Sequence, residues 1–248
     1  MTAPVLLRPA LFDGVPGVAA AFTTRHGGVS APPYASLNLG LSTDDDPAHV
    51  HENRRRVAAA LGFAPEALAL AGQVHGAAVR VVTAPGLYPG FDGLVTATPG
   101  LLLGITAADC AAVLLADADA GVVGACHAGW RGTVAGVVPA TLDALRTLGA
   151  RPERLRAYVG PCISARHFEV GPEVAARFDA AFVLRTPGQK PHVDLKAAVE
   201  AQLRQGGIPP DHIEVSARCT FAETHTFFSH RAEHGRTGRM MGLIGLRA

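Results

Sequence analysis

The sequence lacks the features that mark membrane proteins, secreted proteins and nucleic-acid-binding proteins. Its most apolar region, residues 93–128, is interrupted by one proline and three aspartates, so it is not a clean membrane span. Charged residues and prolines also break the apolar N-terminal segment, which excludes the core of a signal peptide. The formal net charge is only +1, which gives no general attraction for nucleic acid or an anionic membrane. We therefore expect a soluble, cytoplasmic protein without nucleic-acid or membrane partners.

Cysteine is scarce, and its spacing indicates no disulfide framework. The four cysteines are Cys110, Cys126, Cys162 and Cys219, and no two of them form a CxxC pair. In a chain of 248 residues, so few cysteines do not build a disulfide scaffold. We expect free thiols in a reducing compartment, where one or more can serve as a metal ligand or a nucleophile.

The composition that remains is that of a folded globular chain. Hydrophobic residues make up 48% and charged residues 17% of the sequence, enough apolar material for a sizeable core. No internal repeat, low-complexity linker or domain boundary is visible, so residues 1–248 are interpreted as one domain. No oligomerisation signature stands out either, and we expect a monomer.

The order of elements predicts an α+β fold with substantial antiparallel sheet. Asp46 followed by Pro47 is typical of a helix start, and Gly62 of the end of the same helix. Three more helices are expected over residues 133–148, 172–181 and 194–205. The expected strands cover residues 77–83, 94–96, 101–105, 110–116, 122–128, 156–159, 213–217, 226–229 and 239–246.

Two neighbouring apolar runs suggest a metal site. If Ala118-Asp119 is a two-residue hairpin loop, paired residue numbers sum to 237, and Cys110 lies opposite His127 on one face. His75, where a loop enters a strand, is the best third ligand. A catalytic zinc typically has three protein ligands and one open position, and a His/Cys/His set suits zinc or copper. The alternative is two hydrogen-bonded structural histidines and a buried thiol.

The stretch GACHAGWRGT, residues 124–133, suggests a second feature beside this hairpin. Gly129 and Gly132 precede or open a helix, whose free N–H groups and dipole attract anions, and Arg131 would strengthen the attraction. The alternative is ordinary helix capping and packing of the tryptophan. Asp109, next to the predicted cysteine ligand, is a candidate to orient a ligand or to carry a proton. Cys126 should face the core, because neighbours on a strand point to opposite faces.

A series of motifs, in this order along nearly the whole chain, resembles one widespread bacterial family. That family is described variously as polyphenol oxidase or laccase-like, peptidoglycan-editing-factor-like, or purine nucleoside phosphorylase. The motifs are ASLNLG (35–40), ENRRRV (52–57), QVHG (73–76), DGLVT (92–96), TAADC (106–110), CHAGWRGT (126–133), YVGPCIS (158–164), FEVGPEV (168–174), FFSHR (227–231) and GRTGR (235–239).

The resemblance implies one α+β domain of mixed, largely antiparallel sheets sandwiched with helices. It implies zinc held by His75, Cys110 and His127, with phosphorolysis of adenosine, inosine, guanosine and methylthioadenosine, and adenosine deamination at the same site. The partners are then purine nucleosides and phosphate. The candidates for phosphate and substrate contacts are Arg131, Gly129, Gly132, Asn38, Arg54 and Arg231.

Three alternatives stay open at this point. Copper at the same site would suit a polyphenol oxidase, although a multicopper cluster needs several H-x-H motifs and the chain has one, His49 and His51. Cys110 is also a candidate nucleophile for a hydrolase that edits peptidoglycan precursors. The third alternative is a binding module that the metal merely stabilises.

Overall fold

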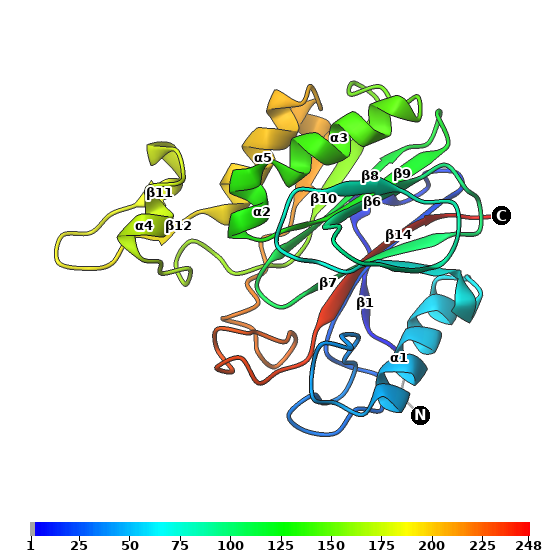
Figure 1. The fold of residues 1–248 in the computed structure, drawn as a ribbon, viewed down its shortest axis with the longest axis horizontal. Coiled ribbons are helices and arrows are strands. Elements are labelled where there is room, and N and C mark those ends of the chain that lie inside the picture. Colours follow the sequence, from blue (N-terminus) through cyan, green and yellow to red (C-terminus); the bar gives the residue numbers. More distant parts are fainter. Residues whose placement is uncertain (1–2) are drawn as a thin grey trace.

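The computed structural model describes residues 3–248, which form two six-stranded sheets packed face to face (Figure 1). The first sheet contains, in spatial order, β1 (Leu6–Leu7), β2 (Val18–Thr23), β14 (Met240–Leu246), β7 (Leu102–Ala107), β3 (Leu68–Ala71) and β5 (Gly86–Tyr88). The second contains β13 (Ile213–Val215), β10 (Arg156–Val159), β8 (Ala111–Asp117), β9 (Val122–Ala128), β6 (Gly93–Thr96) and β4 (Val79–Val81). Most neighbouring strands are antiparallel, which confirms the predicted mixed, largely antiparallel α+β fold.

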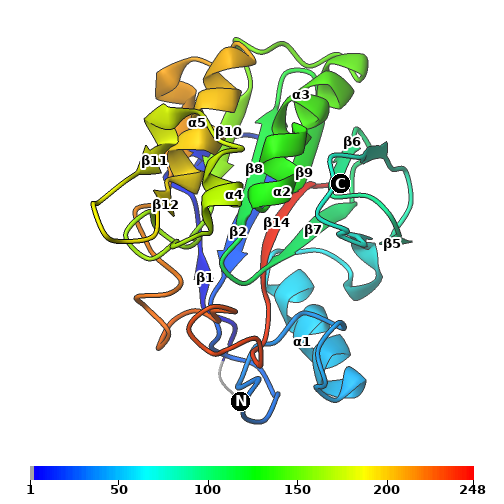
Figure 2. The ribbon, with the colours of Figure 1, turned by 60° about the vertical axis from the view of Figure 1, so that its left-hand side comes forward.

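Helices cover both outer faces of this pair of sheets (Figures 1 and 2). The outer face of the second sheet packs against α3 (Val137–Thr147) and α5 (Leu195–Gln205). The outer face of the first sheet packs against α1 (Pro47–Ala60). A small hairpin of β11 (Val183–Leu184) and β12 (His192–Val193) lies apart from both sheets. Within residues 3–248, no helix has the length and hydrophobicity needed to cross a bilayer.

The four layers enclose three apolar cores because strand side chains alternate between faces. On β8, Val113 and Leu115 point toward the helices, whereas Leu114 points into the space between the sheets. On β2, Phe22 points into that same space, whereas Ala21 faces α1. Strands that are buried on both faces are apolar throughout, which is why the sequence shows continuous apolar runs here.

Helix-capping signals in the sequence are confirmed where they are strongest. The Asp46 carboxylate accepts a hydrogen bond from the backbone N–H of Ala48 at 2.8 Å, and Pro47 is the first residue of α1. Gly62 follows the helix with φ of +81°, a conformation that glycine adopts without strain. Asp194 caps α5 in the same way through the N–H of Ala197.

Several sequence-predicted elements are wrong. The single helix expected over 133–148 is two helices, α2 (Trp130–Ala135) and α3, because Gly136 between them has φ of +86°. The helix expected over 172–181 ends early, as α4 (Pro172–Ala175), and Asp179 then caps a separate 3-10 turn. Residues 226–229 form no strand, and the short strands β3 and β5 were not predicted.

The register of the β8–β9 hairpin also differs from the prediction. Asp117 pairs with Val122 across a four-residue turn, and its carboxylate accepts a hydrogen bond from a backbone N–H inside that turn at 3.1 Å. Paired numbers therefore sum to 239, and Ala112, not Cys110, lies opposite His127. A slip of two residues keeps every side chain on its face. Cys110, just before β8, thus stays on the same side of the sheet as His127.

Candidate functional site

Three side chains that could ligate a metal meet at the end of the space between the sheets. His75 lies on the loop between β3 and β4, Cys110 lies in the turn before β8, and His127 lies on β9. Their ligand atoms all lie within 4.8 Å of one another. The two imidazole rings meet edge to face, with centroids 4.8 Å apart. The structure thus gathers the three predicted ligands, with His127 buried and His75 open to solvent.

A fully buried carboxylate, Asp92, holds two of these ligands in place. Its Oδ1 lies 2.9 Å from Nδ1 of His127 and accepts the backbone N–H of His75 at 3.0 Å. Its Oδ2 accepts the N–H groups of Val74 and Gly76 at 3.0 and 2.8 Å. Because Nδ1 of His127 is engaged, Nε2 is the atom left to bind a metal. The role of Asp92 was missed, although the aspartate directly before β6 was visible in the sequence.

The backbone around the ligands has an unusual conformation. Gln73, His75 and Asp109 have φ values of 50°, 62° and 82°, in the left-handed region that non-glycine residues rarely adopt. The Gln73 amide is fastened to β7, where it donates to the carbonyl of Thr106 at 2.8 Å and accepts from its N–H at 2.8 Å. Such conformations persist where surrounding contacts enforce them, and they concentrate at functional sites.

Cys110 and His127 strongly influence each other's pKa. Burial alone would raise the pKa of the Cys110 thiol, but the neighbouring His127 and His75 rings outweigh it and lower the pKa to about 6. Burial would lower the pKa of His127, but the Cys110 thiolate and Asp92 raise it to about 9. Without a metal, the two groups form a thiolate–imidazolium pair. In contrast, burial raises the pKa of Cys126 to about 12, and this thiol lies in the core as predicted.

The ligands form part of the wall of a cavity of about 630 Å³. The wall also includes parts of β3, β5 and β7, residues 40–42 and His230. Two of its lining residues, Leu41 and Leu87, are exposed apolar side chains. Two arginines, Arg54 and Arg239, also line the cavity. A space of this size suits a small molecule with both apolar and charged parts.

Neither cavity arginine forms an ion pair with any carboxylate among residues 3–248. Nε and Nη2 of Arg54 donate to the carbonyl of Leu39 at 2.9 and 2.8 Å. Nη1 of Arg239 donates to the carbonyl groups of Thr237 and Gly238 at 2.7 and 2.9 Å. Burial lowers the pKa of Arg54 to about 10, which keeps its guanidinium cationic at neutral pH, and burial also lowers the pKa of Arg239. Each guanidinium keeps further N–H donors for an anion.

The predicted anion-binding corner lies outside this cavity. Arg131 is exposed and stacks over the Trp130 ring at 4.3 Å. A Cβ on Gly129 would lie 2.8 Å from Sγ of Cys110, and one on Gly132 would lie 3.0 Å from a backbone oxygen. These glycines therefore allow the start of α2 to pack against the ligands, and neither lines the cavity.

Asp109 and Arg231 are tied to each other rather than to the cavity. The Asp109 carboxylate accepts hydrogen bonds from Thr220 Oγ1 at 2.6 Å, Ser229 Oγ at 2.8 Å and the backbone N–H of Arg231 at 2.7 Å. The Arg231 side chain donates to the carbonyl of Glu169 at 2.9 Å. The Asp109 carboxylate thus fastens the C-terminal segment beside Cys110.

Asn38 supports the cavity from behind. It is fully buried, and its Oδ1 accepts the backbone N–H of Arg239 at 2.9 Å and that of Gly40 at 3.0 Å. Its Nδ2 donates to Thr43 and Asp45, each at 2.9 Å. Asn38 therefore positions Arg239, a cavity residue that sequence reasoning missed although the motif GRTGR contains it.

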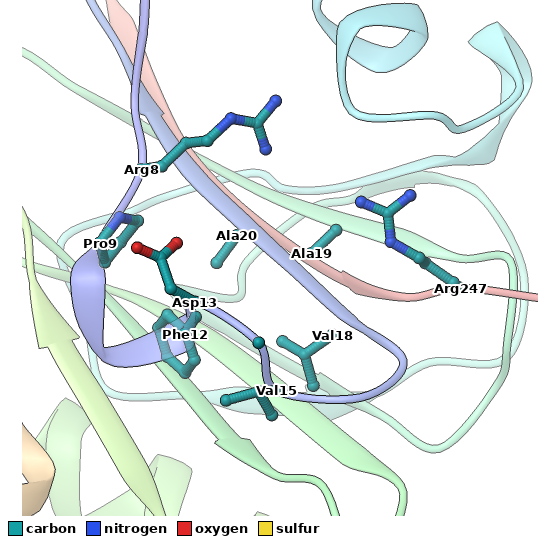
Figure 3. A pocket seen from close by; sticks show the side chains of 10 residues that line it. Arg8, Pro9, Phe12, Asp13, Val15, Val18, Ala19, Ala20 and Arg247 are labelled. Carbon is teal, nitrogen blue, oxygen red and sulfur yellow. The ribbon is translucent and has the colours of Figure 1, made fainter.

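A second hollow, of about 280 Å³, lies beside β2 (Figure 3). Arg8 and Arg247 stand on opposite sides of it, above Ala19 and Ala20 of that strand. None of the residues predicted for the functional site lines it. The three candidate metal ligands and the half-buried Arg54 and Arg239 thus belong to one cavity only.

Comparison with known proteins places this arrangement in a family. Residues 19–247 match the model of the multi-copper polyphenol oxidoreductase laccase family. The chain belongs to that laccase family. Among relatives, a purine nucleoside phosphorylase of Deinococcus radiodurans is 50% identical, over 99% of this chain and 95% of its own length. A purine nucleoside phosphorylase of Mycobacterium tuberculosis is 44% identical, over 90% and 89% of the two chains.

Solved structures share the laccase-family fold across the whole chain. YlmD from Geobacillus stearothermophilus matches with a TM-score of 0.92 and 37% identity, covering 98% of this chain and 96% of its own. The hypothetical protein YfiH from Bacillus licheniformis also matches with a TM-score of 0.92, at 35% identity and 99% and 97% coverage. The two-sheet architecture is therefore that of this family.

Proposed function

We propose that this protein is a zinc-dependent purine nucleoside phosphorylase. Its substrates are adenosine, inosine, guanosine and methylthioadenosine, and it deaminates adenosine at the same site. The observation that carries the proposal is that a single cavity holds a His/Cys/His ligand set and two arginines that form no ion pair with a carboxylate among residues 3–248. Phosphorolysis requires both an anionic nucleophile and a polarised substrate. Relatives up to 50% identical named purine nucleoside phosphorylase support the same reaction.

In this proposal, Arg54 and Arg239 bind the phosphate that attacks C1′ of the ribose. Both arginines are half-buried, and charge-assisted hydrogen bonds from a guanidinium group to phosphate are strong. The backbone carbonyl groups that accept from each side chain hold it in one orientation. Arg131, in contrast, is given no role in phosphate binding, since it lies outside the cavity. We propose the same for Gly129, Gly132 and Arg231.

His75, Cys110 and His127 would hold the zinc, since two nitrogens and one sulfur in close proximity match its preferred donors. When bound, zinc supplies a Lewis acid with an open coordination position. Asp92 keeps the His127 ring oriented and its Nε2 directed at the cavity. We give Asp109 no role in proton transfer, because its oxygens already accept three hydrogen bonds that fasten it to the C-terminal segment beside Cys110.

The test is chromatography of adenosine incubated with the zinc-loaded protein, with and without phosphate. Phosphate-dependent formation of adenine and ribose 1-phosphate is expected, together with some inosine from deamination. Cys110→Ala should abolish both activities. If no purine nucleoside is converted by protein shown to contain zinc, the proposal is wrong.

Arginine variants test the phosphate site separately. Arg54→Ala and Arg239→Ala should each raise the KM for phosphate by roughly 10- to 100-fold, because each removes charged hydrogen bonds of about 1.5–3 kcal/mol. Arg131→Ala is the matched control and should leave this KM unchanged. If Arg131→Ala raises the KM for phosphate strongly and the other two variants do not, the phosphate site lies at the start of α2 instead.

One observation favours a second candidate, a copper-dependent polyphenol oxidase. The family model is described as an oxidoreductase, and copper binds His/Cys/His sets at least as tightly as zinc. The H-x-H pair His49 and His51 lies on α1, outside the cavity lining, which leaves no multicopper cluster there. Metal analysis of protein purified without added copper, with an assay of phenol oxidation, distinguishes the two.

We also propose that the protein is a monomer in the cytoplasm, in keeping with its free thiols.

A further inference from the structure

A second cluster of thiols and imidazole lies outside the metal centre. Sγ of Cys219 lies 3.5 Å from Nδ1 of His167, and the same nitrogen lies 3.1 Å from Oγ of Ser164. The His167 ring is stacked on Phe221, with centroids 4.8 Å apart and planes 22° apart. The imidazole is thus held beside the sulfur in an orientation that can accept the thiol proton.

The surroundings of Cys219 stabilise a thiolate. Sγ accepts the backbone N–H of Ser164 at 3.3 Å, and the N–H groups of Phe221 and Ala222 also point at it. Burial alone would raise the pKa of this thiol, but Ser164 and these backbone donors lower it below its ordinary value. Cys219 keeps an exposed fraction of 8%, whereas Cys162 and Cys126 have none.

A second cysteine, Cys162, lies on the neighbouring backbone segment. Cys162 and Cys219 are partners in an isolated parallel β-bridge. Neighbouring strands lie about 4.7–4.9 Å apart, within the range of about 4.4–6.8 Å between Cα atoms that a disulfide spans. Burial raises the pKa of the Cys162 thiol to about 12, so this thiol stays protonated and is not the first to be oxidised. The two thiols therefore differ in reactivity while lying side by side.

We propose that Cys219 is a peroxide-reactive thiol which, assisted by His167, forms a reversible disulfide with Cys162. His167 takes the proton of Cys219, and the thiolate attacks a hydroperoxide oxygen. The S–O bond forms, the O–O bond breaks, and the leaving oxygen takes the proton from His167. Cys219 is oxidised to sulfenic acid, and the hydroperoxide is reduced to water or an alcohol. The Cys162 thiol then displaces the sulfenic oxygen, which leaves with the Cys162 proton as water.

The pair is connected directly to the metal centre. The residue after Cys162, Ile163, donates its N–H to the carbonyl of Asp109 at 3.0 Å. The residue after Cys219, Thr220, donates its hydroxyl to the carboxylate of Asp109 at 2.6 Å. Asp109 directly precedes the proposed zinc ligand Cys110. A disulfide between the two strands would therefore act on the turn that carries this ligand.

The test is peptide mass spectrometry of the folded, unsubstituted chain after hydrogen peroxide treatment and alkylation. A linked peptide containing Cys162 and Cys219 is expected, removable by a dithiol. Cys126 is the internal control, since it is fully buried and should stay reduced. The proposal is overturned if Cys219 is oxidised no faster than Cys126, or if its only disulfide partner is Cys110. This readout is independent of nucleoside turnover, so it does not depend on the proposed function.

Variants assign the order of the steps. In Cys162→Ala, Cys219 should accumulate as sulfenic acid that dimedone traps, whereas in Cys219→Ala, Cys162 should stay a thiol. His167→Asn should slow oxidation of Cys219 by about tenfold at an unchanged melting temperature, because less thiolate is present. If His167→Asn leaves the rate unchanged, the assigned role of the imidazole is wrong. Cys162→Ser replaces the alanine variant if that fails to fold.

Discussion

The carboxylate of Asp92 links the two histidine ligands, and its replacement by asparagine should damage the metal site directly. An amide oxygen can replace only one of the two carboxylate oxygens, so about two of the four hydrogen bonds are lost. If Oδ2 is replaced by the amide oxygen, the amide NH₂ faces Nδ1 of His127 and the N–H of His75. The His127 ring then favours the tautomer protonated at Nε2, which removes the ligating lone pair.

The expected magnitudes follow from these lost contacts. Two hydrogen bonds to a buried charge at about 1.5–3 kcal/mol each give a loss of about 3–6 kcal/mol in the free energy of unfolding. Loss of a carboxylate behind a metal-binding histidine typically costs about 10- to 100-fold in metal affinity. We expect both effects for Asp92→Asn. Chemical denaturation of the metal-free protein measures the first, and competition with a zinc chelator measures the second.

Asp117→Asn is a matched control for this experiment. Asp117 is also fully buried, and its carboxylate accepts hydrogen bonds from the N–H groups of Ala120 and Arg151 and from the Arg154 side chain. It does not contact the ligands, so its variant should lose comparable stability and keep the zinc affinity of the unsubstituted protein. Equal zinc affinities for the two variants would refute the reasoning about Asp92.

The remaining predictions concern packing, pH and metal removal. Gly129→Ala should weaken zinc binding at least about tenfold in chelator competition, because its Cβ would lie 2.8 Å from Sγ of Cys110, although alanine tolerates φ of −74° there. Unchanged zinc affinity would mean that the backbone around Cys110 moves enough to accommodate the added methyl group. Backbone and Arg154 donors outweigh burial and hold the pKa of Asp117 below its ordinary value of 3.8. The ionised Asp117 therefore contributes its full stabilisation above pH 3.8 and loses it as the pH falls further. In urea unfolding, the difference in free energy of unfolding between the unsubstituted protein and Asp117→Asn should become smaller below pH 3.8. A stability difference that stays the same at all pH values would contradict the lowered pKa of Asp117. Chelation should abolish activity without unfolding the chain by circular dichroism, because apolar cores hold the sheets that carry the ligands; unfolding would instead indicate a structural metal.

Local sequence signals were sufficient where one residue dictates one backbone feature. Asp46 and Pro47 start α1 as predicted, and the apolar run 122–128 coincides with β9, because strands buried on both faces are apolar throughout. Gly136 was equally visible, yet a glycine inside a helical pattern signals a break only when tertiary packing gives it a positive φ. Residues 226–229 read as a strand because two buried phenylalanines lie there, but the segment turns back toward Glu223 instead.

The sequence by itself determined which side chains could ligate a metal and on which face of the hairpin they lie. That face survived a register error, because strand side chains repeat every two residues and the error was two residues. Only the tertiary structure decided what surrounds the ligands. Asp92, Arg54 and Arg239 come from segments far apart in the chain, and no local periodicity records their convergence. For the same reason, the sequence did not indicate that Arg131 lies outside the cavity, since the direction of its side chain depends on how α2 packs against the sheet.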